Sequence, residues 1–253
     1  MARSKKPLLS LETQKLRLAL KAAFETPYLD SGKNVGAFTC GVYAFFDYDN
    51  EPIYVGQTFE GLSSRIGRHL TNQRTDAVAM SVLDPFEVFA IEMYPLVEHD
   101  GVKRTFMDAE RRRKNPEFDK AKADLNALEL SVFRKCIAKS RFKAVLNEKD
   151  PAPTSLTIEV PVPVRAEIVG EEVLEIRGHA DVRIARRAQT IARLAQVISE
   201  RQVSVGLRRS LLVQAQRLEF LAGEQLKAWG GAGAVPKKSP EAAEDEEDDT
   251  AIS

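Results

Sequence analysis

The segment between residues 38 and 55 constrains the fold more than any other part of the chain. The run from Phe38 to Tyr48 is rich in aromatic and β-branched residues, and a second short run, Ile53 to Val55, follows closely. The residues between the two runs, Asp49 to Pro52, have the turn chemistry that joins antiparallel strands. The pattern therefore predicts a β-hairpin.

Helices and one further strand are predicted around this hairpin. A helix from Leu11 to about Glu25 has Ser10 as its cap and ends before Pro27. The sequence also predicts a helix over residues 61–71, a strand over 86–94 and a long helix over 120–140. This order of elements is typical of an α+β fold with a small, mostly antiparallel three-stranded sheet flanked by helices.

The second half of the chain differs in composition. Residues 150–165 contain four prolines, which favour an extended segment and mark a domain boundary. Two helices are predicted beyond it, over 180–200 and 206–228, as a helical hairpin. The expected organisation is an N-terminal helix and lead-in (1–34), a main domain (35–150), a proline-rich extended linker (151–177), the helical hairpin (178–229) and a disordered acidic tail (230–253).

The formal net charge of zero conceals an uneven distribution. Seven of the 37 acidic residues lie between Glu241 and Ser253, where there is no basic residue. Residues 1–240 therefore hold 37 bases against 30 acids, a net charge of +7. This excess permits a polyanionic partner without requiring one.

Cysteine content and hydropathy indicate the compartment. Cys40 and Cys136 are too few for a disulfide framework and lack the paired spacing of a zinc site. No segment approaches the roughly 20 consecutive apolar residues of a membrane-spanning helix, and the N-terminus lacks the apolar run of a secretion signal. We therefore expect a cytoplasmic protein.

Two tyrosines are expected on adjacent strands of the hairpin, within the tripeptides Gly41-Val42-Tyr43 and Tyr54-Val55-Gly56. Cross-strand neighbours lie about 5 Å apart, so two phenols on one face can share a site. In the next helix, Arg65 and His69 lie side by side on the flank of an apolar stripe. Taken alone, the position of this pair favours solvated surface residues over a functional site.

Glu129 occupies the middle of the apolar face of the long helix predicted over 120–140. Burial of an unpaired carboxylate costs several kcal/mol, so Glu129 should have a partner. The partner is either a basic side chain or a metal ion, and the spacing alone favours the salt bridge.

The two tripeptides and the Arg65 and His69 pair together resemble the GIY-YIG endonuclease family, over roughly residues 35–150. Both isoleucine positions of the motif hold valine here, which keeps a β-branched residue. The resemblance implies that Glu129 binds a metal ion and that Asn147 completes the site. The implied catalytic residues are Tyr43, Tyr54, Arg65, His69 and Asn147, and Gly41 and Gly56 are the structural glycines of the motif.

The resemblance implies hydrolysis of phosphodiester bonds with one divalent cation, Mg²⁺ or Mn²⁺, in DNA rather than RNA, and a bacterial or phage origin. Arg65 would hold a non-bridging phosphate oxygen, and Tyr43, with Tyr54 as its partner, would act as general base. A base role at neutral pH requires the phenol pKa to fall by about three units, roughly 4 kcal/mol. The alternative is a catalytically inactive, nuclease-like module that binds nucleic acid or a protein partner.

Other features allow several interpretations. The basic run Arg111 to Lys114 is interpreted either as solvated surface or as a set of phosphate contacts. The acidic tail is interpreted either as a solubilising end or as a mimic of DNA phosphate. Eight arginines between Gly178 and Arg217 accompany apolar stripes on the two predicted helices. They indicate a helical hairpin that docks on the main domain or self-associates, a nucleic-acid surface, or an unrelated partner. His99 and His179 are expected at the surface.

Overall fold

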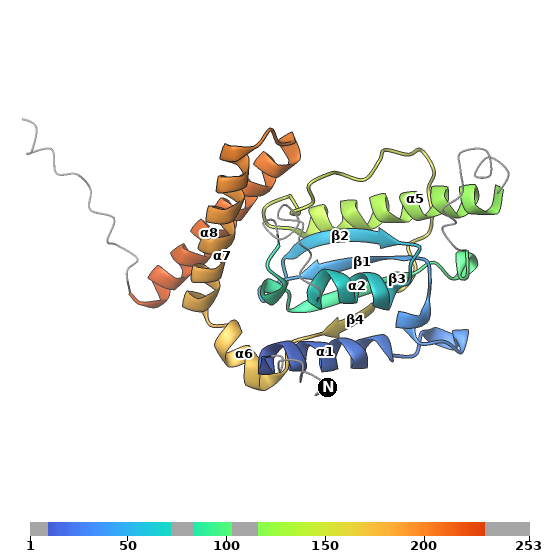
Figure 1. Ribbon diagram of the computed structural model, residues 1–253, viewed down its shortest axis with the longest axis horizontal. Helices are drawn as coiled ribbons and strands as arrows, with labels where there is room; N and C mark the ends of the chain where they lie inside the picture. The colour runs from blue at the N-terminus through green and yellow to red at the C-terminus, as the bar shows by residue number, and fades with distance from the viewer. Residues whose placement is uncertain (1–9, 72–82, 103–115, 231–253) are drawn as a thin grey trace, which may run out of the picture.

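A computed structural model describes residues 10–71, 83–102 and 116–230. Its centre is an antiparallel sheet of four strands in the order β2-β1-β3-β4, so β2 and β4 are the edge strands (Figure 1). The strands are β1 (Gly41–Phe46), β2 (Pro52–Thr58), β3 (Ala90–Pro95) and β4 (Val164–Glu167).

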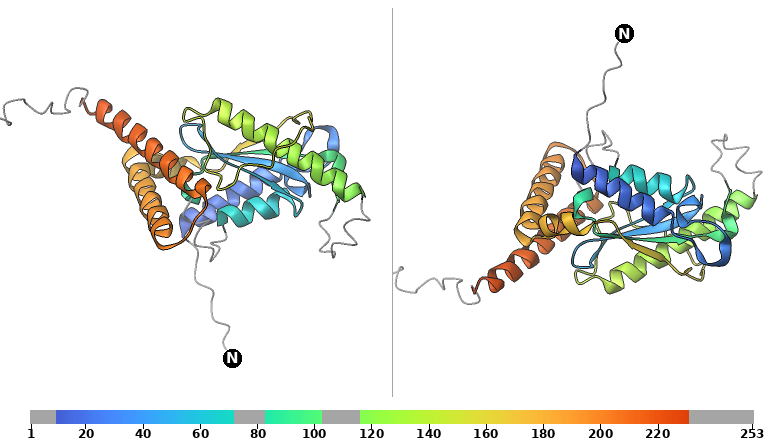
Figure 2. Two further views of the ribbon diagram at one scale, coloured as in Figure 1. Left: turned by 90° about the horizontal axis from the view of Figure 1, so that it is seen from above. Right: turned by 90° about the horizontal axis from the view of Figure 1, so that it is seen from below.

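Helices cover both faces of the sheet, which is why β1 and β3 are buried along their whole length (Figure 2). Helices α1 (Leu11–Phe24) and α2 (Leu62–Thr71) pack on the face that carries Tyr43. Helix α5 (Pro116–Lys139) packs on the opposite face, where Leu125 and Leu128 meet Val42. This arrangement confirms the predicted α+β fold.

The remaining elements connect and extend this core. Four short 3₁₀ helices are η1 (Leu29–Ser31), η2 (Val35–Ala37), η3 (Pro85–Glu87) and η4 (Val97–His99). Three helices follow the sheet: α6 (Glu171–Arg177), α7 (Ala180–Glu200) and α8 (Val205–Ala228). No helix among the described residues is long and apolar enough to cross a membrane.

The sheet has one strand more than the sequence predicts, and this strand comes from the expected linker, 151–177. β4 pairs with β3, and Val164 and Ala166 pack against the core. The prolines precede β4, and β4 is an edge strand, where a missing N–H breaks no ladder. The third predicted strand also begins late, because Pro85 and the Asp84 cap turn residues 85–87 into a 3₁₀ helix.

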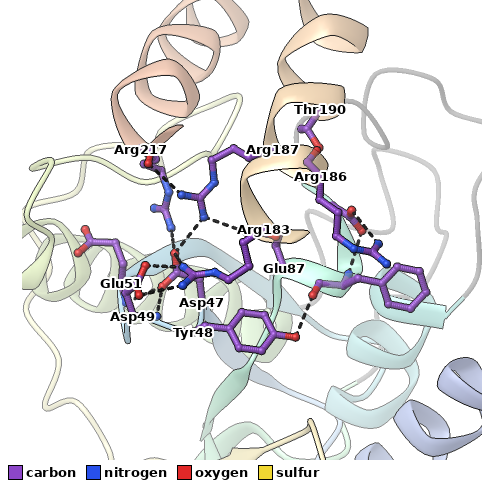
Figure 3. A network of polar contacts seen from close by, with 12 residues as sticks. Asp47, Tyr48, Asp49, Glu51, Glu87, Arg183, Arg186, Arg187, Thr190 and Arg217 are labelled. Atoms are coloured by element: carbon purple, nitrogen blue, oxygen red, sulfur yellow. Dashed lines mark hydrogen bonds and ion pairs between the residues drawn. The ribbon is translucent and has the colours of Figure 1, made fainter. Parts of the chain in front are cut away.

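Helices α7 and α8 form the predicted hairpin, and it docks against one end of the sheet through buried charges (Figure 3). Asp47, which follows β1, forms ion pairs with Arg187 and Arg217, and Arg187 also binds Glu87 at 2.9 Å. Arg183 forms a bidentate pair with Asp49. Docking on the main domain is thus the interpretation that the contacts support for these arginines.

The apolar stripes expected on this hairpin are confirmed only in part: Ile198 and Leu211 pack against the main core, but other positions of the stripes do not. Ala188 and Ala215, which continue these stripes in the sequence, are exposed, whereas Arg187 and Arg217 are buried. These two arginines turn inward because Asp47 and Glu87 of the main domain meet them there. His99 is likewise not at the surface: it is buried, with Nε2 2.7 Å from Oδ2 of Asp124.

Two predicted features lie outside the described residues. They are the basic run Arg111 to Lys114 and the acidic tail from Glu241.

Candidate active site

The pairing of β1 with β2 places the two tyrosines on one face of the sheet. Tyr43 is opposite Gly56, and Tyr54 is opposite Phe45, so the tyrosines are diagonal neighbours. Their ring centroids are 6.1 Å apart. The shared face expected from the sequence is therefore present, with a diagonal rather than a direct pair.

Gly56 creates the space in which the two phenols meet. A Cβ atom at this position would lie 2.6 Å from the hydroxyl oxygen of Tyr43 and 2.9 Å from the ring of Tyr54. The Tyr43 ring thus extends over Gly56 toward the edge of the sheet. Gly41 meets a different constraint, because its Cβ would lie 2.7 Å from the carbonyl oxygen of Tyr94 on β3.

Helix α2 brings a cation and an imidazole to the phenols. Its apolar residues Leu62, Ile66 and Leu70 are buried as predicted, which leaves Arg65 and His69 half-buried on its flank. Nδ1 of His69 lies 3.4 Å from the hydroxyl oxygen of Tyr43, and the imidazole packs edge-on against the ring of Tyr54. The pair is therefore part of the site and not solvated surface.

Both phenols hold their protons at neutral pH. Burial raises the pKa of Tyr43, whose exposed fraction is 0 %, and the Arg65 guanidinium opposes this shift only in part. Burial also raises the pKa of Tyr54, and the neighbouring phenol adds to the rise. The lowered phenol pKa that a free tyrosinate base would need is thus not a property of the protein alone.

Glu129 reaches the same region from α5, on the other face of the sheet. Burial raises the pKa of its carboxyl to about 7, and a hydrogen bond from Gln57 of β2 acts in the opposite direction. The carboxylate also interacts electrostatically with Tyr43 and Tyr54. The acid, the two phenols and the α2 pair therefore converge at the β2 edge of the sheet.

The surroundings of Glu129 suit a divalent cation. No ion pair involves this carboxylate in the described part of the chain, so the salt bridge favoured by the spacing has no support there. The described residues also contain no group of three or more His, Cys, Asp or Glu side chains that could together hold a metal ion. A single half-buried carboxylate fits a hard cation whose other ligands are water and phosphate oxygens.

Asn147 lies at the site but acts on the backbone. Its Oδ1 accepts a hydrogen bond from the N–H of Val55 at 3.0 Å, and its Nδ2 donates to the carbonyl of Val55 at 2.7 Å. Because β2 is an edge strand, these bonds replace those that a further strand would supply. This contact positions β2 between Tyr54 and Gly56, and a direct catalytic role for Asn147 stays a prediction.

Sequence reasoning missed two polar residues of the site, Gln57 and Asn126. The side-chain nitrogen of Gln57 donates to Oδ1 of Asn126 at 2.9 Å as well as to Glu129. Their positions in the sequence could have indicated them, because Gln57 directly follows Gly56 and Asn126 precedes Glu129 by about one helical turn.

Comparison with known proteins gives one match. No curated protein and no solved structure matches the chain. The family described as GIY-YIG catalytic domain matches residues 39–117, a range that contains both tyrosines, Arg65 and His69 and ends before Glu129. The chain therefore carries a GIY-YIG catalytic domain, the domain of a family of nucleases.

Proposed function

We propose that the protein is a metal-dependent endonuclease that hydrolyses phosphodiester bonds in DNA. The observation that carries this proposal is the convergence of Tyr43, Tyr54 and Glu129 at the edge of β2, with Arg65 and His69 beside them. The net charge of +7 over residues 1–240 is compatible with a polyanionic substrate.

Glu129 would hold the divalent cation, Mg²⁺ or Mn²⁺, because its carboxylate interacts electrostatically with both phenols. When bound, the cation supplies stabilisation of the negative charge that develops on the leaving 3′ oxygen and on the phosphate. Arg65 would bind a non-bridging phosphate oxygen, since its guanidinium is half-buried beside Tyr43 and charged at every pH of interest.

The tyrosines would take part in removing a proton from the attacking water. Because the Tyr43 phenol is neutral, it acts best as a relay: its oxygen accepts the proton of the water while its own proton passes to Nδ1 of His69, 3.4 Å away. The water becomes the hydroxide that attacks phosphorus, and the bond to the 3′ oxygen breaks. This route needs no free tyrosinate before the reaction.

A plasmid-cleavage assay with and without Mg²⁺ or Mn²⁺ tests the proposal. We expect cation-dependent nicking by the wild-type protein and losses of a hundredfold or more in Tyr43→Phe and Glu129→Gln, in line with the 10²–10⁴-fold contribution of positioned proton transfer. Tyr48→Phe is the matched control, because the Tyr48 phenol donates to the carbonyl of Phe86 in a different part of the fold.

Full activity of Glu129→Gln would remove the metal role from this residue. Cleavage of an RNA of the same sequence at the same rate as the DNA would contradict the assignment of DNA as substrate. Wild-type protein that binds the plasmid but never cuts it would favour the inactive module.

A further inference from the structure

Gln57 lies on the opposite face of β2 from the tyrosines. Side chains alternate along a strand, so Gln57 shares a face with Val55, which packs on the side of α5. β2 is an edge strand and contacts α5 along its length. The Gln57 amide therefore meets α5 at the border of the sheet, next to the carboxylate proposed to bind the cation.

Two hydrogen bonds fix the orientation of this amide. Its nitrogen Nε2 donates to Oε2 of Glu129 at 2.8 Å and to Oδ1 of Asn126 at 2.9 Å. An amide nitrogen has two hydrogens, so both are used. The flipped amide would turn its carbonyl oxygen toward a carboxylate, which disfavours the alternative orientation.

The two acceptors belong to one helix turn. Asn126 and Glu129 are three residues apart on α5 and are therefore neighbours on the helix surface. Gln57 comes from a strand pinned by Asn147 through Val55, two residues earlier in the chain. The triangle of Gln57, Asn126 and Glu129 thus joins the strand of the phenols to the helix of the acid.

We propose that Gln57, held by Asn126, is a positioning residue that fixes the Glu129 carboxylate for the divalent cation. This inference rests on the proposed function. The bond to Gln57 occupies one lone pair of Oε2 and leaves Oε1 for the cation. Partners of this kind orient metal ligands, and their loss typically weakens metal affinity 10- to 100-fold.

A purely structural role for Gln57 predicts something different. In that case the amide satisfies two buried acceptors between β2 and α5, and its loss lowers stability without a specific effect on cation binding. The distinguishing measurement is therefore the affinity for the metal alone, together with its dependence on pH.

Mn²⁺ titration of the full chain, with free Mn²⁺ followed by electron paramagnetic resonance, provides this measurement at pH 7 and pH 8.5. We expect Gln57→Met to weaken Mn²⁺ binding about tenfold or more at both pH values, because the misplaced carboxylate is not restored by deprotonation. Asn126→Ala should cause a smaller loss, since Gln57 keeps its donor but loses its own restraint. Gln189→Met, the same change at an exposed position of α7, should bind as the wild type does.

Each outcome decides between the two roles. If Gln57→Met binds Mn²⁺ within twofold of the wild type while Glu129→Gln loses binding, the positioning role is overturned and the proposed function stays intact. A loss at pH 7 that disappears at pH 8.5 also overturns it, because Gln57 then acts only on the charge of Glu129. Wild-type binding by Glu129→Gln, or no saturable binding by the wild type, overturns the metal site of the proposed function itself. Urea unfolding of each variant establishes that it is folded.

Discussion

At the scale of single residues, the charged form of Glu129, which the proposed metal binding needs, destabilises the folded protein. Burial raises the pKa of its carboxyl from 4.5 to about 7, so the folded state prefers the protonated form. The stability that follows from this preference is fully present below pH 4.5 and is lost as pH rises through 7. At neutral pH the carboxylate is therefore a cost to the fold, which a bound cation would offset.

Glu129→Gln should consequently stabilise the protein while it abolishes cleavage. We expect the free energy of unfolding to rise by about 1–2 kcal/mol at pH 8, after allowance for the partial exposure of the group, and to change little at pH 4. Urea unfolding at the two pH values, with no divalent cation added, measures the effect. An equal gain at both pH values would assign it to packing and not to charge.

Gly56 is a second residue with a local role, because the Tyr43 phenol occupies the space that a side chain at this position would need. Gly56→Ala places a methyl group 2.6 Å from the Tyr43 hydroxyl oxygen, so the phenol must move, which disturbs its 3.4 Å contact with His69. We expect a stability loss of about 1–3 kcal/mol and a larger relative loss of plasmid cleavage. Gly67→Ala in α2 is the control: nothing lies within 4 Å of its Cβ, and helix propensity favours alanine. Equal activity of the two variants would contradict the steric argument.

At the scale of elements, local signals were sufficient for most helices. Ser10 caps α1 by accepting from the N–H of Thr13, and Ser204 caps α8 by accepting from Leu207, so these helices begin within one residue of the prediction. Strand β4 has only four residues between prolines and a helix, and only its pairing with β3 makes it a strand. The Gln57 contact to Glu129 spans 72 positions and has no local signature.

The same limit applies to the docking of α7 and α8. The sequence showed the arginines but not the direction of their side chains, because buried arginines require carboxylates, and these come from 100 or more positions away in the chain. Asp47 joins the two parts: Oδ1 accepts from the N–H groups of Asp49 and Glu51 in the β1–β2 turn, and Oδ2 meets Arg187 and Arg217.

Asp47→Asn should therefore be among the most damaging single changes. Asparagine can keep the turn bonds, but it leaves Arg217, whose exposed fraction is 1 %, without its carboxylate, and we expect a loss of about 3–5 kcal/mol. Arg217→Met should cost less, because Asp47 still has Arg187 and Arg183 nearby. Asp150→Asn, which breaks an exposed pair with Arg209, is the control and should cost less than about 1 kcal/mol. Urea unfolding ranks the three variants, and an Asp47→Asn variant as stable as the control would show that the buried network contributes nothing net.

At the scale of the whole molecule, the described part of the chain after residue 150 packs with the sheet that carries the candidate active site. β4 covers the edge of β3, Ile168 is buried in the main core, and Leu194 and Leu207 of the hairpin join that core. The candidate active site lies at the opposite edge, on β2, yet the turn between β1 and β2 is held by Asp47 and hence by the hairpin. The predicted organisation into a domain over 35–150 and a linker over 151–177 stays a prediction, and these contacts lead us to propose that the second half of the chain folds together with the sheet.

Three truncations test this view. A chain that ends at residue 230 keeps every described residue and should unfold cooperatively at the temperature of the full chain. A chain that ends at 177 keeps β4 but uncovers Ile53 and Leu146 and removes the cations that face Asp47, so it should unfold at a lower temperature. A chain that ends at 150 also exposes the β3 edge and should show no cooperative transition in circular dichroism. If residues 1–150 unfold cooperatively and still cleave DNA, the second half of the chain is an appendage, and the coupling through Asp47 has no part in forming the site.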